Sequence, residues 1–126
     1  DVLAIRSRTL PDDHPGLLRA RSGVAAVSRA MGDLEAAREQ QEQVLAAYTA
    51  AHPEDHPNVV LARNNLALTL LDLGRSQEAR ALLEQVVASR ARLLAEDHPS
   101  LLAARNNLAS VLRDLDELDA ARDQME

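Results

Sequence analysis

Residues 55–79 read DHPNVVLARNNLALTLLDLGRSQEA, and the same pattern returns on both sides of them at a fixed distance. The triplet Asp-His-Pro occurs at 13–15, 55–57 and 97–99, which is a spacing of 42 residues. Residues 13–54 laid over 55–96 are identical at 14 of 42 positions, and residues 55–84 laid over 97–126 are identical at 15 of 30. A fixed period of about 20 to 50 residues is typical of solenoids, in which each unit buries its apolar face against its neighbours. The chain is therefore predicted to be a repeat array.

Apolar residues within this stretch follow helical spacing. Leu66, Leu70 and Leu73 lie at i, i+4 and i+7, which places them on one face of a helix. Gly74 stands where a helix would end, and polar residues follow it. From Ala79 onward the helical period of apolar residues resumes. Each repeat is therefore predicted to be a pair of helices joined by a short turn.

The Asp-His-Pro triplet precedes each predicted pair. Asp55 can accept a backbone N–H as an N-cap, and Pro57 suits a first helical turn because its missing donor would be unpaired there anyway. His14, His56 and His98 lie one period apart, so they cannot converge on one ion, and a zinc site needs three or four convergent ligands. The triplet is therefore predicted to start helices, and no metal site is expected.

Extending this pattern to the whole chain predicts an all-α superhelix of antiparallel helix pairs in one domain, 1–126. Helices are expected near residues 1–10, 14–31, 34–51, 57–73, 76–95, 99–115 and 118–126. Residues 1–12 align with 43–54, so we expect the second helix of a truncated repeat, then repeats 13–54 and 55–96, then a truncated repeat 97–126. Neither end has the polar capping helix of a finished solenoid, so a segment of a longer array is expected. Asp116 replaces the glycine of the earlier repeats, which predicts a strained turn or a different cap there.

The composition narrows the function classes. The net charge is -6 and the acids are spread along the repeats, so nucleic acid and anionic membranes are not expected partners. There is no Cys, and no apolar run approaches the ~20 residues of a membrane helix, which favours a cytoplasmic location. All 14 basic residues are Arg, which indicates a GC-rich bacterial genome. No phosphate-binding glycine loop and no nucleophile with a base partner is recognisable, so no cofactor and no enzyme activity are expected.

The stretch Asn65–Ala79, which fits N-L-A-x-x-L-x-x-L-G-x-x-x-E-A, resembles a tetratricopeptide repeat. The 42-residue length and the Asp-His-Pro start resemble the long variety found in kinesin light chain and in many bacterial signalling proteins. The resemblance covers the whole chain. The family usually has aromatic residues where this chain has Arg63, Leu70 and Leu83. Repeat one departs most, with Ser22-Gly23 in place of the Asn pair, Ser28 in place of Leu70 and Gln41 in place of Leu83, so it is expected to be the least stable unit.

The resemblance also implies a binding surface, because the first helices of the pairs line a concave groove in this family. The positions that match the groove are Arg19, Ser22, Gly23, Ala26, Arg29, Ala30, Leu61, Asn64, Asn65, Leu68, Leu71, Asp72, Ala103, Asn106, Asn107, Ser110, Arg113 and Asp114. Asn65 and Asn107 match the position that peptide-binding relatives use to hold a peptide backbone. A carboxamide suits this task because it has both a donor and an acceptor. The alternative is that the Asn pairs bond to neighbouring helices and never meet a ligand.

Charged residues at repeating positions have two interpretations. Arg19, Arg29 and Arg113 could clamp an acidic partner by bidentate pairing, or they could simply be solvated. The recurring Arg63 is expected to pack its stem along the helix interface, as are its counterparts Arg21 and Arg105. Three i, i+4 pairs are expected to support second helices by about 0.2 to 0.5 kcal/mol each: Arg38/Glu42, Arg80/Glu84 and Arg122/Glu126.

Two functions follow as hypotheses. The first is a protein-interaction scaffold that binds a peptide or a helix in the concave groove. The second is a structural arm or self-association element of a larger bacterial signalling protein, such as a STAND-type NTPase. Three periods of 42 fill the 126 residues, so the two ends form complementary pieces of one repeat. Head-to-tail association is therefore expected through apolar residues of the two ends: Val2, Leu3 and Ile5, and Leu115, Leu118 and Met125.

Overall fold

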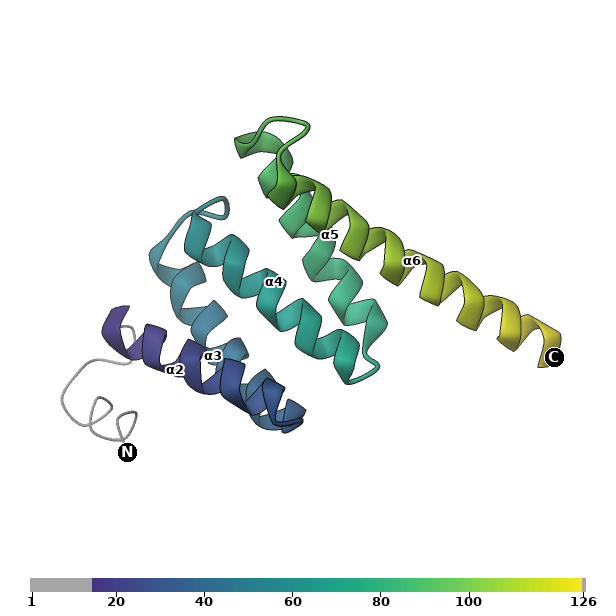
Figure 1. The fold of residues 1–126 in the computed structure, drawn as a ribbon, viewed down its shortest axis with the longest axis horizontal. Helices are drawn as coiled ribbons and strands as arrows, with labels where there is room; N and C mark the ends of the chain where they lie inside the picture. The colour runs from purple at the N-terminus through teal and green to yellow at the C-terminus, as the bar shows by residue number, and fades with distance from the viewer. Residues whose placement is uncertain (1–14, 126) are drawn as a thin grey trace.

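Five helices follow one another along the chain in the computed structural model, which describes residues 15–125, and for 118–125 only the course of the backbone (Figure 1). They are α2 (Pro15–Ala30), α3 (Leu34–Ala51), α4 (Pro57–Asp72), α5 (Ser76–Leu93) and α6 (Pro99–Met125). Each helix packs against the next in sequence. The predicted helix pairs are therefore present for 15–93, with ends within two residues of those expected from the sequence.

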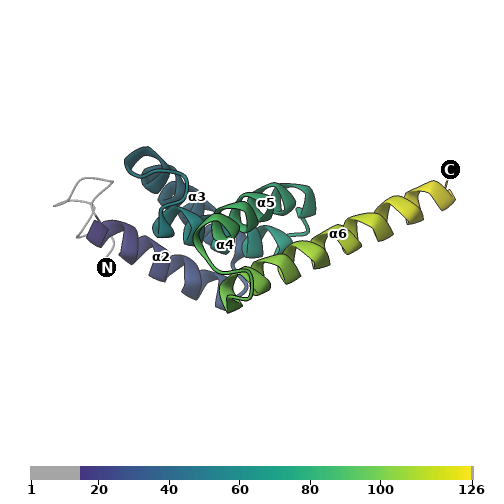
Figure 2. The same ribbon diagram turned by 90° about the horizontal axis from the view of Figure 1, so that it is seen from above.

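The helices form two layers. Figure 2 shows α2, α4 and α6 on one side and α3 and α5 on the other, with α4 set back between α2 and α6. The largest apolar cluster lies between the layers and joins α4, α5 and α6 through Leu66, Leu70, Leu83, Val111 and Leu115. This is the lengthwise core expected of a solenoid, since each helix buries its apolar face only against neighbours.

Glycine ends the first helix of each complete pair. Gly32 and Gly74 have φ angles of 85° and 79°, a left-handed conformation that disfavours residues with a Cβ. The N–H of Arg75 donates to the carbonyl of Leu70 at 2.8 Å, and that of Asp33 donates to Ser28 at 2.8 Å. These bonds close the helix end in a Schellman motif, which satisfies carbonyls that would otherwise lack a donor.

The third repeat does not form the predicted pair. Helix α6 runs without interruption from Pro99 to Met125, so the expectation of separate helices at 99–115 and 118–126 is wrong. Asp116 lies inside this helix, at the position that is Gly32 and Gly74 in the other repeats. A left-handed turn costs a residue with a side chain about 1–2 kcal/mol, whereas continuing the helix avoids that cost. The missing glycine therefore explains the missing turn.

The predicted role of Asp55 as an N-cap is also wrong. His56 is the cap, because its Nδ1 accepts from the backbone N–H of Asn58 at 3.1 Å. His98 does the same for Ser100 at 3.0 Å, so the histidines, rather than the acids, start these helices. A ring nitrogen can accept here only when it carries no proton.

Asp55 instead ties the start of α4 to α5. Its carboxylate accepts from Ser89 Oγ at 2.7 Å and from the Arg92 guanidinium at 2.6 and 2.9 Å. The hydrogen bonds from Arg92 and then from Ser89 lower the pKa of Asp55 to about 2. This triplet therefore contributes a contact between the two helices of one repeat, α4 and α5, as well as a cap.

The other structural expectations have mixed outcomes. Arg63 is 8% exposed and Arg21 is half-buried, as their predicted packing requires, but Arg105 is exposed, so the prediction is wrong for Arg105. The i, i+4 pairs Arg38/Glu42 and Arg80/Glu84 are present at 2.8 and 2.7 Å. The remaining expectations lie outside the described residues or side chains: the helix at 1–10, His14, the apolar ends at Val2, Leu3, Ile5, Leu118 and Met125, and the pair Arg122/Glu126. Among the described helices, none is long and apolar enough to cross a membrane.

Candidate functional site

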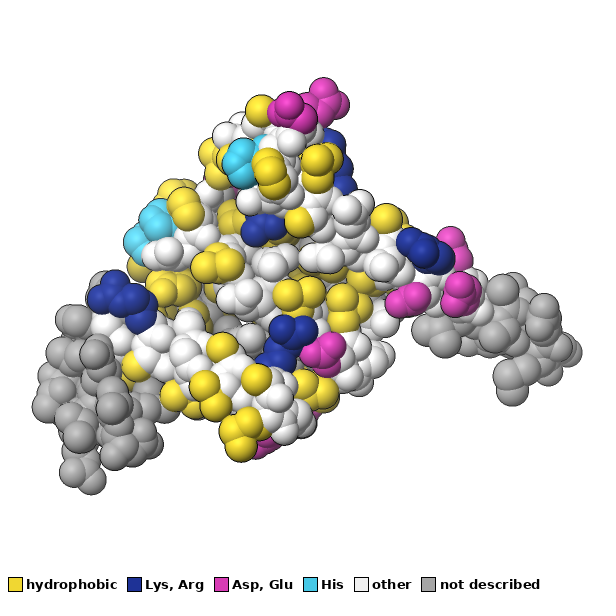
Figure 3. All heavy atoms as spheres, viewed as in Figure 1, with side chains coloured by type: hydrophobic (Ala, Val, Ile, Leu, Met, Phe, Trp, Pro, Cys, Tyr) yellow, Lys and Arg dark blue, Asp and Glu magenta, His cyan; other side chains and the backbone are white. Residues whose placement is uncertain are grey.

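The predicted groove corresponds to the face formed by α2, α4 and α6. Figure 3 views this face, and its middle carries mainly apolar and uncharged side chains, with the charged ones gathered in a few groups. Few of the acidic side chains that the structure describes therefore lie in the middle of this face. Such a surface suits a partner that is held by apolar contacts and hydrogen bonds more than by charge.

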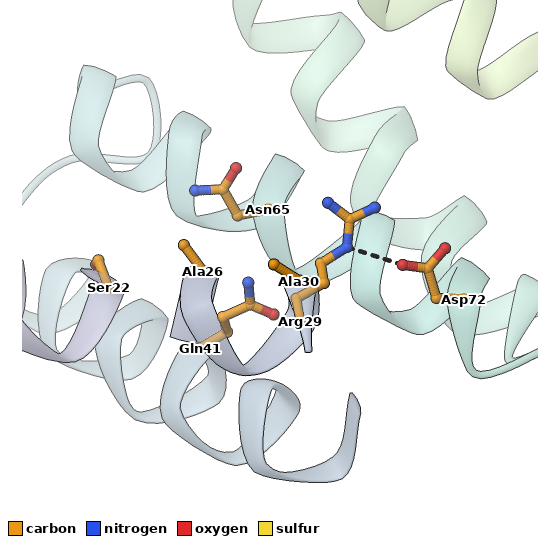
Figure 4. A pocket seen from close by; sticks show the side chains of 7 residues that line it. All are labelled: Ser22, Ala26, Arg29, Ala30, Gln41, Asn65 and Asp72. Carbon is orange, nitrogen blue, oxygen red and sulfur yellow. Dashed lines mark hydrogen bonds and ion pairs between the residues drawn. The ribbon is translucent and has the colours of Figure 1, made fainter. Parts of the chain in front are cut away.

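A cavity of about 330 Å³ opens on this face between α2, α3 and α4 (Figure 4). It is lined by Ser22, Ala26, Arg29, Ala30, Gln41, Asn65 and Asp72. Six of these seven residues belong to the set that the sequence places in the groove, and Gln41 is the exception. The structure thus brings predicted groove residues of two adjacent repeats together around one hollow.

The mouth of this cavity is held by an ion pair. Arg29 Nε lies 2.8 Å from a carboxylate oxygen of Asp72, and both side chains are about 40% exposed. Asp72 engages only Nε of Arg29, so an acidic ligand at the two terminal nitrogens would lie beside the Asp72 carboxylate. Arg29 is thus neither simply solvated nor unpaired, and its role as a clamp for an acidic partner stays a prediction.

Gln41 forms the part of the cavity that sequence reasoning missed. It is 8% exposed, and no donor among the described residues reaches its side-chain oxygen Oε1. Leu83 occupies the same position in the second repeat, where it is fully buried in the apolar core. The sequence does show a polar residue, Gln41, at a position that is apolar in the second repeat. It does not show which neighbouring helices surround that residue, and these decide whether it lines a cavity.

The Asn side chains divide between the two interpretations. The amides of Asn65 and Asn107 are half-buried and make no hydrogen bond to any other described residue. Asn64 differs, because its Oδ1 is buried, again without a donor among the described residues. Asn106 is exposed on α6. The bonds to neighbouring helices that a purely structural role requires are therefore absent from the described part of the chain.

The remaining predicted groove residues are spread along the face. Leu61 is 53% exposed and lines a second, mainly apolar cavity of about 210 Å³ between α4, α5 and the start of α6. Burial lowers the pKa of Arg90 beside it, and the Arg90 guanidinium donates to the carbonyl of Ser100 at 3.1 Å. Leu68 is half-buried, whereas Arg19, Ser110 and Arg113 are exposed. The predicted groove residues therefore line one polar cavity together, and Leu61 alone of them reaches the apolar cavity.

The ionisable groups of the described residues do not form a metal centre, since no group of three or more His, Asp or Glu side chains could hold an ion. His52 and His56 stack with ring centroids 3.8 Å apart. Parallel stacking points their ring nitrogens along the ring planes instead of toward a shared point, and Nδ1 of His56 is engaged in the helix cap. The side chains on the face formed by α2, α4 and α6 can therefore bind a partner through hydrogen bonds and apolar contacts.

Two layers of consecutive helix pairs, with glycine turns and an exposed concave face, define an α-solenoid of the helix-pair class. The family model described as tetratricopeptide repeat matches residues 18–91 and 58–126, so it covers most of the chain. The chain belongs to the tetratricopeptide repeat family, and its array is of the kinesin-light-chain-like type. Repeats of this family are generally protein–protein interaction modules, and the fold is of a non-catalytic scaffold type.

Solved structures support this assignment. A structure of nearly identical repeats from a protein of Podospora anserina, assigned as a kinesin light chain, has 35% identity and a TM-score of 0.88 over 95% of this chain. A variant of that protein has 37% identity and a TM-score of 0.84 over 87% of this chain. BtubC (BKLC) from P. vanneervenii shares the fold, with a TM-score of 0.81 over 95% of this chain at 18% identity. The chain spans about half of these proteins, 57%, 52% and 48% of their lengths respectively. A search of curated proteins gave no match.

Proposed function

We propose that this chain binds an extended peptide or a helix of a partner protein across the face formed by α2, α4 and α6. The observation that carries the proposal is the 330 Å³ cavity, because residues predicted for the groove from two repeats line it together. A cavity of that volume matches the lower end of the range for ligand sites and is large enough for a side chain. Repeat arrays commonly use such concave surfaces for binding.

The chemistry of the face supports a peptide as the ligand. Asn65 and Asn107 have side-chain amides without partners among the described residues, one on α4 and the other at the same position on α6. Each amide can accept from a backbone N–H and donate to a backbone carbonyl whatever the partner's side chains are. The apolar cavity beside Leu61 adds a place for an apolar side chain of the same ligand.

The proposal can be tested without a known partner. A random peptide library is selected on the folded chain, and a selected peptide is titrated by calorimetry. Changing both Asn65 and Asn107 to Ala should weaken binding, since each lost hydrogen bond costs about 0.5–1.5 kcal/mol. Gln85→Ala is the matched control, because this carboxamide is exposed on α5 in the other layer. Equal affinity of wild type and the double variant would return both Asn residues to a structural role.

The alternative, an arm or self-association element within a larger signalling protein such as a STAND-type NTPase, requires a different observation. A nucleotide-binding domain in the same parent chain would favour it. The cytoplasmic and bacterial setting expected from composition remains part of this proposal, and localisation of the tagged parent protein would test it.

A further inference from the structure

The cavity between α2, α3 and α4 has a buried polar side chain, Gln41, at its base, which we call its floor. Gln41 comes from the second-layer helix α3 and reaches into the polar cavity, at a position where repeat two has the fully buried Leu83. Its Oε1 is shielded from solvent and has no donor among the described residues. A buried acceptor left without a partner costs about 1–3 kcal/mol, so this position is not explained by stability of the array.

Two hollows share this floor. A chamber of about 20 Å³ lies between Ser22, Gln41 and Asn65, with Val44 and Ala62 completing its lining. The cavity of about 330 Å³ shares Ser22, Gln41 and Asn65 with it. One water molecule could fill the small chamber, which is slightly larger than the minimum for a water. The larger cavity has room for a side chain of a partner.

Small residues on α2 make this room. Ala26 and Ala30 line the cavity at positions that are Leu68 and Asp72 in the next repeat. Figure 4 shows these two alanines with Asn65 on one side and the amide of Gln41 on the other. Two of the residues that make repeat one irregular as a tetratricopeptide repeat, Ser22 and Gln41, thus line the same cavity.

We infer that this cavity takes the side-chain carboxamide of an Asn or Gln residue of the partner protein. The inference rests on the proposed function and adds the chemistry of one ligand residue to it. When the amide of Gln41 turns about its last bond, Oε1 faces the cavity and accepts from an entering –NH₂ group, while the entering carbonyl accepts from the amide of Asn65 or the hydroxyl of Ser22. A carboxamide can turn about its last bond, so a ligand with both a donor and an acceptor pairs with Gln41 in either orientation.

Other side chains fit these groups less well. A carboxylate has no donor for Oε1 of Gln41, and at the mouth it would lie beside the like charge of the Asp72 carboxylate. An ammonium group has no acceptor atom, and it would pass the Arg29 guanidinium to enter. A hydroxyl has its donor and acceptor on one atom, so it does not span the two amides that line opposite sides of the cavity in Figure 4.

The test uses acetamide as a probe for the side chain, titrated through the millimolar range into the whole isotope-labelled chain and followed by NMR. The side-chain amide signals of Gln41 and Asn65 should shift in a saturable way. Acetate and methylammonium are run in parallel as the acidic and basic probes. Gln41→Leu restores the residue that repeat two has at this position and should abolish the shifts at Asn65. Gln85→Leu is the matched control and should leave them unchanged.

Each result decides the inference. Saturation by acetamide alone, lost in Gln41→Leu, supports a carboxamide site. Equal shifts with acetate or methylammonium would overturn the carboxamide assignment, and no saturation with any probe would overturn the cavity as a ligand site. Gln41→Met and Asn65→Ala provide second variants if circular dichroism shows that Gln41→Leu does not fold.

Peptide selection separates this inference from the proposed function. Peptides selected on the wild type should share an Asn or Gln at one position, and its replacement by Leu should weaken binding by about 2- to 10-fold, the effect of one lost hydrogen bond. Selected peptides without such a residue would leave the proposed function standing and refute the carboxamide site. Failure to select any peptide would count against the proposed function, while the acetamide titration would still decide the cavity.

Discussion

Replacing two glycines by alanine should change stability in opposite directions. Gly23 lies in the interior of α2 with an ordinary helical backbone, whereas Gly74 ends α4 with a φ of 79°. A Cβ added at either position meets no atom within 4 Å, so crowding does not contribute. The backbone conformation is therefore the main difference between the two substitutions.

The magnitudes follow from that difference. Gly23→Ala should stabilise the fold by about 0.5–1 kcal/mol, because alanine loses less conformational freedom in a helix. Gly74→Ala should destabilise it by about 1–2 kcal/mol, the cost of the left-handed conformation for a residue with a side chain. The two variants should therefore differ by about 1.5–3 kcal/mol in their free energies of unfolding.

Urea unfolding followed by circular dichroism measures both values, and an unchanged m-value shows that the unfolded state has not altered. Gly32→Ala is an independent repeat of the Gly74→Ala experiment, since the φ of Gly32 is 85° and its surroundings are equally open. If Gly74→Ala and Gly23→Ala shifted stability in the same direction, the left-handed turn would not be the reason for glycine at position 74.

Four further results are expected. Ala79 is fully buried between the helices of its pair, so Ala79→Leu should overpack the core and lower the urea midpoint by the equivalent of about 1–3 kcal/mol; an unchanged midpoint would contradict this packing. His56→Ala should cost about 1 kcal/mol by removing the cap of α4, whereas His56→Asn should retain most of it. The pKa of Asp55 is lowered from 3.8 to about 2, so its contribution to the stability of the fold is complete above pH 3.8 and is lost as the pH falls toward 2. Asp55→Asn should therefore make stability depend less on pH in that window. An unchanged dependence would mean that the pair with Arg92 does not stabilise the fold. Light scattering over a hundredfold dilution tests head-to-tail association, which Ile5→Glu should abolish, and a monomeric mass throughout would refute it.

Local signals account for what could be predicted of the fold. Pro57 and Gly74 mark a start and an end through their own backbone chemistry, so the helix between them was predicted to within one residue. Asp116 shows the limit of copying one repeat onto another. The 42-residue period predicted a turn there, but the residue that makes the turn was missing and the helix continued.

Contacts between distant residues account for what could not be predicted. Asp55 has the right chemistry for an N-cap, and only the position of Arg92, 37 residues further along the chain, shows that it serves α5 instead. The groove residues were predicted from the family resemblance, and six of them line one cavity. Gln41 was identified only as a departure from the repeat, because an unpaired oxygen is a property of three packed helices and not of one position.

The uninterrupted helix α6 has a consequence for how such arrays change during evolution. A hairpin returns the chain to its neighbour, whereas 27 helical residues carry it about 40 Å in one direction. Some glycine and aspartate codons differ by a single base. One base change at the position of Asp116 could therefore replace a continuous helix by a helix pair joined by a glycine turn. Duplicated copies of one unit can in this way acquire different reach and different surfaces while most of their sequence stays the same.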